Sequence, residues 1–279
     1  MIPATVLLAA ALAAEAMTPA ASPPSPAAPP PAQPASEAAP PAEPPAAPAV
    51  DPLAAALARS DDAYAQRDQP GQLEAAQAAL EAAAAVAPGA YAILWRQARL
   101  LVWRSEEPGL PKERKSELGK QAWELADRAC VAAPDRVEGW FYAMNGVGAY
   151  SQGLGIISAL TQGMEGKFKD RLGRAERLDP GFQAGAIPTA WGRFWFELPW
   201  PKHDAGKSLK ALNAALQVNP ANVRAHVYLG DLLADEGKKS EAAAAYRAAQ
   251  ETPPGRYDTP EERRWQVVAR AALERLEKK

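Results

Sequence analysis

The densest group of side chains that could bind a ligand lies in an aromatic segment near residue 195. Five aromatic residues fall within ten positions: Trp191, Phe194, Trp195, Phe196 and Trp200. On a helix the first three share one face through i, i+3 and i+4 spacing, so we predict that they pack in the core. Trp200 and Phe196 are predicted to line a cleft at the end of a helical hairpin. Arg193 is then an anchor for an anion, and His203 borders the same cleft.

A second candidate group begins at Trp140-Phe141-Tyr142 and continues to Asn145. Tyr142 and Asn145 are predicted to contact a ligand or a peptide. Four glycines follow at 146, 148, 153 and 155. We expect these glycines either to permit close helix approach or to break the helix near Ser151.

One segment nearly matches a phosphate-binding loop. Residues 201–208 read PKHDAGKS, which has the closing Gly-Lys-Ser but a proline where the first glycine belongs. Pro201 lacks the backbone freedom of glycine, and no β-branched strand precedes it, so nucleotide binding is not predicted. Asp204 is predicted to be a helix N-cap instead.

Few other residues could support chemistry. Cys130 is the only cysteine, which excludes an intramolecular disulfide and a CxxC site, and we predict that it is a small buried side chain. The two histidines, His203 and His226, cannot be paired with a serine or carboxylate by spacing. We therefore predict no catalytic residue, no metal site and no cofactor, and expect a protein that is not an enzyme.

Charge argues against nucleic acid as a partner. The net charge is −2, and residues 1–50 hold three acids and no lysine or arginine, so residues 51–279 carry one net positive charge. Binding to a phosphate backbone needs a basic excess, which this segment lacks.

The first fifty residues differ in composition from the rest. Ile2 to Ala14 is apolar and ends in Ala14-Glu15-Ala16, which predicts a signal peptide over residues 1–16, removed after Ala16. Residues 17–50 contain 13 prolines and 12 alanines, which predicts a disordered, extended linker. No cysteine follows the apolar run to accept a lipid, so we expect a soluble periplasmic or secreted protein whose folded domain spans 51–279.

An internal repeat begins at Asp51. Each unit closes on a proline, at positions 88, 134, 180, 220 and 254, and small residues recur five and twelve positions before it. These residues are Ala83 and Ala76, Ala129 and Ala122, Ala175, Ala215 and Ser208, and Ala249 and Ala242; only Phe168 is large. Small side chains let two helices approach closely and proline ends the second, so each unit is predicted to be a helical hairpin.

The fifth unit shows the pattern most fully. It runs from His226 through Leu229-Gly230, Leu233, Gly237, Ala242, Tyr246 and Ala249 to Pro254, and it resembles a tetratricopeptide (TPR) repeat. Thr259-Pro260-Glu261-Glu262 is predicted to be a capping box that opens a last helix to about Lys278. The predicted fold is all-α, a TPR-like solenoid of about five hairpins with a C-terminal capping helix.

The repeat is irregular. Its closing prolines lie 46, 46, 40 and 34 residues apart, and extra residues fall near 106–115, 151–169 and 198–204. We predict a surface loop in the first of these segments. Arg177-Leu178-Asp179-Pro180-Gly181, Gly185-Ala186 and the segment Gly192 to Trp200 are similar to periplasmic TPR-fold proteins associated with TRAP transporters.

That resemblance implies a periplasmic accessory protein that can form oligomers. Such a protein would hold an apolar or organic-acid ligand, or dock a solute-binding protein. The alternative is a general TPR scaffold that binds a peptide or partner protein on its concave face. An enclosed aromatic cavity would favour the first function, and polar concave residues the second.

Overall fold

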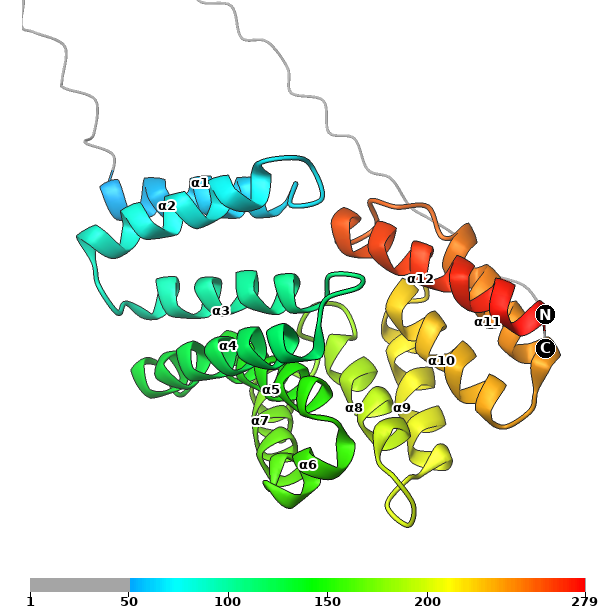
Figure 1. Ribbon diagram of the computed structural model, residues 1–279. Coiled ribbons are helices and arrows are strands. Elements are labelled where there is room, and N and C mark those ends of the chain that lie inside the picture. Colours follow the sequence, from blue (N-terminus) through cyan, green and yellow to red (C-terminus); the bar gives the residue numbers. More distant parts are fainter. Residues whose placement is uncertain (1–50, 279) are drawn as a thin grey trace, which may run out of the picture. The chain divides into compact units, whose positions relative to one another are not determined.

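The computed structural model describes residues 51–278, and these residues form twelve α-helices and no strand (Figure 1). The predicted signal peptide and linker lie outside the described residues. The helices are α1 (Pro52–Tyr64), α2 (Gln72–Val86), α3 (Tyr91–Ser105), α4 (Lys112–Ala132), α5 (Val137–Leu154), α6 (Ile156–Thr161), α7 (Met164–Leu178), α8 (Ala186–Glu197), α9 (Ala205–Val218), α10 (Val223–Asp235), α11 (Lys239–Glu251) and α12 (Thr259–Glu277).

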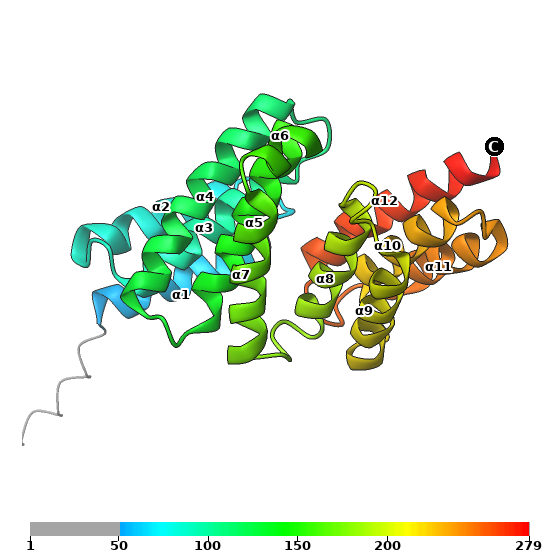
Figure 2. The same ribbon diagram turned by 90° about the horizontal axis from the view of Figure 1, so that it is seen from below.

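Helices pair in chain order into five hairpins. The pairs are α1 with α2, α3 with α4, α5 with α7, α8 with α9 and α10 with α11. Helix α12 packs on α11 and α10 and completes the array (Figures 1 and 2). The predicted solenoid of five hairpins and a capping helix is confirmed.

Small residues at the repeat positions make these pairings possible. All nine small residues at the predicted positions are fully buried. Ala242 and Ala249 pack in one cluster with Val227 and Tyr246, as predicted for the contact within the last hairpin. Cys130 is also buried, and burial raises the pKa of its thiol to about 12.

The extra residues take different forms in the second and third hairpins. In the second, residues 106–111 form the predicted loop after α3, but helix α4 begins at Lys112 and takes up the rest of the segment. In the third hairpin they form the short helix α6. Helix α5 does not break near Ser151 but continues to Leu154, because the left-handed residue that ends it is Gly155, at φ +83°.

Two helix starts were predicted from capping residues. Asp204 caps α9, since its carboxylate accepts a hydrogen bond from the Lys207 amide at 2.9 Å, as predicted. The capping box predicted for the start of α12 placed the N-cap at Thr259, one residue after its actual position. Asp258 is the cap of α12, and its carboxylate accepts from the Glu261 amide at 3.3 Å.

The capping helix α12 touches the first two hairpins. Arg67, just after α1, pairs with Asp258, 191 residues further along. Beside this pair, Arg263 bonds Asp68 at 2.7 Å, and Arg264 donates to the Trp103 carbonyl at 2.9 Å. We call these contacts the seam. It joins the two ends of the repeat array across the concave face. Among the described helices, none is long and apolar enough to cross a membrane.

Candidate ligand cavity

The concave face holds a half-open cavity of ≈ 830 Å³. Its wall is built by the first helix of each hairpin, α1, α3, α5, α8 and α10, and by the start of α12, with α6 and α7 closing one part. Ligand pockets in proteins typically measure about 300–1,000 Å³, so the cavity can hold a small organic molecule.

One part of the wall is apolar. It is contributed by α5, the inserted α6, α7 and the end of α8, through Met144, Leu160, Met164, Phe168 and Leu198. Phe168 is the large residue that broke the repeat pattern, and its ring stacks on that of Phe194 at 5.1 Å between centroids. The irregular third hairpin therefore supplies the apolar surface.

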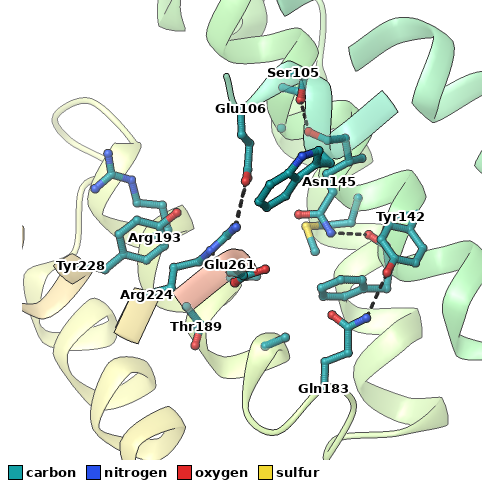
Figure 3. Close-up of a pocket in the computed structure, with 18 of the residues that line it drawn as sticks. Ser105, Glu106, Tyr142, Asn145, Gln183, Thr189, Arg193, Arg224, Tyr228 and Glu261 are labelled. Carbon is teal, nitrogen blue, oxygen red and sulfur yellow. Dashed lines mark hydrogen bonds and ion pairs between the residues drawn. The ribbon is translucent and has the colours of Figure 1, made fainter. Parts of the chain in front are cut away.

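The other part carries charged side chains from α1, α3, α10 and α12. Arg99 donates to the Asp61 carboxylate at 2.7 Å and lies 3.8 Å above the Tyr64 ring. Arg224 donates to both carboxylate oxygens of Glu106, at 3.1 and 2.8 Å (Figure 3). Both guanidinium charges are thus neutralised by acids from other helices.

Burial shifts the pKa values of several of these groups. Burial alone would raise the pKa of Asp61, but hydrogen bonds from Arg96 and Arg99 outweigh it and lower that pKa. The pKa of Glu261 is raised, first by burial and then by the nearby carboxylates of Glu106 and Asp258. Within residues 51–278, no cluster of three or more His, Cys, Asp or Glu is arranged to hold a metal ion.

Three of the predicted site residues line the cavity: Tyr142, Asn145 and Arg193. The Tyr142 ring stacks on Trp95 at 5.9 Å, and its hydroxyl accepts a hydrogen bond from the Gln183 amide at 3.0 Å (Figure 3). Asn145 donates only to the carbonyl of Phe141, one helical turn earlier, at 3.0 Å. Its side-chain oxygen is therefore available to a ligand.

Arg193 is not a free anion anchor. Its guanidinium donates to Asp231 at 2.8 Å and lies 2.5 Å from the Glu197 carboxylate. It also lies over the Tyr228 ring, 4.7 Å from the centroid (Figure 3). Two acids already neutralise this cation, so a ligand anion would have to compete with both of them.

The other three predicted residues, Phe196, Trp200 and His203, do not line the cavity. His203 Nδ1 lies 2.9 Å from the carbonyl oxygen of Phe196, and the two rings are 5.9 Å apart, so this pair closes the turn between α8 and α9. The Trp200 side chain is 89% exposed and does not fold back on its hairpin. A role for these residues in binding a partner stays a prediction.

Sequence reasoning missed the residues of the charged part, above all Arg224 and Glu261. No motif surrounds them, and Glu261 was assigned only to helix capping. The available signal was the position of Arg224 on the first helix of its hairpin, which faces the concave side. Its partner Glu106 lies 118 residues away, a contact that spacing alone does not indicate.

The comparisons with known proteins bear on the fold. The sequence matches no family model and no curated protein. Among solved structures it is similar to TTC0263, a thermophilic TPR protein of Thermus thermophilus, with 20% identity over 80% of this chain and 99% of that one, at a TM-score of 0.59. The chain has a TPR-repeat fold.

Two further structures align less well. YrrB, a TPR protein with an unusual peptide-binding site, shares 18% identity over 71% of this chain and 91% of that one, at a TM-score of 0.40. The flexible tandem repeat domain of a bacterial cellulose synthase component shares 16% identity over 82% of this chain and 99% of that one, at a TM-score of 0.28. Both likenesses are too weak to support a conclusion about function.

Proposed function

We propose that this chain is a non-enzymatic binding protein that holds a small organic ligand in the cavity lined by its repeats. The observation that supports this most directly is the seam, because it brings the capping helix against the first two hairpins. An open TPR groove suits an extended peptide, whereas a half-open space of ≈ 830 Å³ bounded by the seam suits a compact molecule.

We also propose that the protein acts outside the cytoplasm, as an accessory of a solute transport system. This proposal rests on the signal-peptide pattern before Ala16 and on the resemblance of the segment Gly192 to Trp200 to periplasmic TPR-fold proteins. The exposed turn at Trp200 would then be available to a solute-binding protein. A pull-down with exported protein, compared with the Trp200→Ala variant, tests this part.

The experiment for the cavity measures uptake of Nile red, a neutral apolar dye whose emission rises in an apolar site. Asn145→Trp should abolish uptake because the indole occupies the cavity, while the replaced side chain contributes only one hydrogen bond within its own helix. Val131→Trp is the matched control, since Val131 is 84% exposed on α4 and does not line the cavity. Equal uptake by both variants would place the dye elsewhere and count against the cavity.

A peptide-binding scaffold is the second candidate. Polar side chains on the cavity wall support it, in particular Asn145, whose side-chain oxygen can accept a hydrogen bond from a peptide main chain. Mass spectrometry of material extracted from the purified full-length protein distinguishes the two. A small amphipathic molecule supports the first function, and a peptide supports the second.

A further inference from the structure

In the charged part of the cavity, carboxylate and guanidinium side chains are not equally exposed. Seven carboxylate side chains line the cavity against four guanidiniums. The Arg67 side chain is only 2% exposed and that of Arg224 18%, whereas that of Glu261 is 37% exposed. Within the charged part, the carboxylates of Asp61 and Glu261 are thus more exposed than the guanidiniums of Arg67, Arg99 and Arg224.

Glu261 is the least satisfied of these carboxylates. Its nearest cation is Arg224, whose Nε lies 3.0 Å from Glu261 Oε1 but does not point its hydrogen at that oxygen. The other two nitrogens of Arg224 donate to Glu106 (Figure 3). No hydrogen bond reaches the Glu261 carboxylate from any residue in the range 51–278, so its oxygens can still accept hydrogen bonds.

A ligand anion would gain little in this part of the cavity. Arg67, Arg99 and Arg224 already donate to protein carboxylates, and their Nε atoms are unbonded but buried beyond the reach of a ligand, which leaves Arg99 Nη1 as the one other nitrogen of these three without a hydrogen bond from the described residues. A ligand carboxylate would also approach Glu261 and its neighbours Glu106 and Asp258, where like charges repel. The tyrosine hydroxyls of the wall can donate to an anion or accept from a cation equally well, so they do not favour a ligand of either charge.

A ligand cation would instead be attracted by the carboxylates in this part of the cavity. An ammonium group at Glu261 would supply hydrogen bonds to an acceptor that lacks them and would offset the cost of keeping that carboxylate in a partly enclosed site. The apolar wall from α5 to α8 gives a hydrocarbon chain a place to lie. We propose that the cavity is selective for an amphipathic amine, with its ammonium at Glu261 and its apolar chain against Met144, Met164 and Phe168. This inference rests on the proposed small-ligand function.

The test is calorimetric titration of the full-length protein at pH 7.5 with three probes of equal chain length: decylammonium, decanoate and decan-1-ol. Decylammonium should bind at least tenfold more tightly than decanoate. Glu261→Gln, which preserves the shape of the side chain, should weaken decylammonium about tenfold and leave decan-1-ol unchanged. Glu241→Gln, on the exposed surface of α11, is the control and should change neither.

Binding of decan-1-ol confirms in each variant that the cavity is intact. Decanoate binding as tightly as decylammonium, or a Glu261→Gln variant that keeps the full preference, would overturn the amine assignment and leave the cavity function standing. If none of the three probes binds, and Nile red uptake also survives Asn145→Trp, the cavity function fails and the amine assignment with it.

Discussion

Arg67 donates hydrogen bonds to both carboxylate oxygens of Asp258, at 2.8 and 2.7 Å, although 191 residues separate them. The arginine follows the first helix and the aspartate caps the last, so this pair closes the seam. The Arg67 guanidinium also lies 4.1 Å from the centroids of the Tyr64 and Trp103 rings. A guanidinium held so deeply is costly to leave without its counter-ion.

We predict that Arg67→Ala lowers the free energy of unfolding by about 3 kcal/mol, because it leaves a desolvated carboxylate and removes packing on two rings. Asp258→Asn should cost about as much, about 3 kcal/mol, since it leaves the more deeply buried charge of Arg67 without its counter-ion even though asparagine remains a good N-cap for α12. Chemical denaturation of the single and double variants measures the coupling between the two residues.

Arg263→Ala is the control for the seam. It removes an exposed pair with Asp68 at the same junction, and exposed pairs contribute only about 0–1 kcal/mol. If it destabilised the protein as much as Arg67→Ala does, burial of Arg67 would not explain the effect.

The repeats could be predicted from the sequence, and the seam could not. Each hairpin is determined by contacts between neighbouring helices, such as the Ser60–Ala76 and Ser208–Gly192 hydrogen bonds across 16 residues, which is why alanine and serine five and twelve positions before a proline marked the buried faces. Closure depends on the rotation accumulated over five hairpins of unequal length. Neither Arg67 nor Asp258 has a sequence pattern that indicates the other.

For the cavity, the sequence likewise predicted which residues lie on the concave face but not which contacts they make with other hairpins. Tyr142, Asn145 and Arg193 reach the cavity because they lie on first helices, whose concave orientation follows from the repeat. Whether Arg193 is free depends on Asp231, in the next hairpin. Trp200 was predicted to line a cleft, yet it is exposed and is not among the residues that line the cavity.

Helices α4 and α5 approach so closely that a side chain does not fit between them at Gly146. A Cβ atom there would lie 2.5 Å from the backbone nitrogen of Trp123, which cannot move aside. Gly146→Ala should therefore destabilise the protein by about 1–3 kcal/mol despite alanine's better helix propensity. Gly173→Ala, in α7, has ordinary contacts only and should stabilise by about 0.5–1 kcal/mol. Thermal unfolding should therefore show a lower midpoint for Gly146→Ala and a higher midpoint for Gly173→Ala than for the unchanged protein.

Asp61 provides a pH-dependent contribution to stability. Although burial opposes ionisation, hydrogen bonds from Arg96 and Arg99 hold its pKa below 3.8 in the folded state. Its stabilisation is therefore complete above the unfolded pKa and is lost as the pH falls through the folded pKa. Asp61→Asn should cost about 1–2 kcal/mol at pH 7, a value reduced for solvent screening, and the difference should shrink below about pH 4.

Denaturation at a series of pH values from 7 to 3 measures that difference. Asp62→Asn is the matched control, because Asp62 is the next residue and its carboxylate is exposed. A cost for Asp61→Asn that stays constant from pH 7 to pH 3 would show that the charge of Asp61 is not its source.

A variant at Trp200 tests partner binding without disturbing the fold. Because its side chain is 89% exposed and lies outside the cavity, Trp200→Ala should change the free energy of unfolding by no more than about 0.5 kcal/mol and leave Nile red uptake intact. Trp103→Ala, at a buried tryptophan of the cavity wall, should cost about 3–5 kcal/mol. An exposed indole at the tip of a turn has no role in packing, so any loss confined to capture of a protein partner would assign this turn to docking. A loss of stability comparable to that of Trp103→Ala would mean instead that the turn packs against the hairpin in solution.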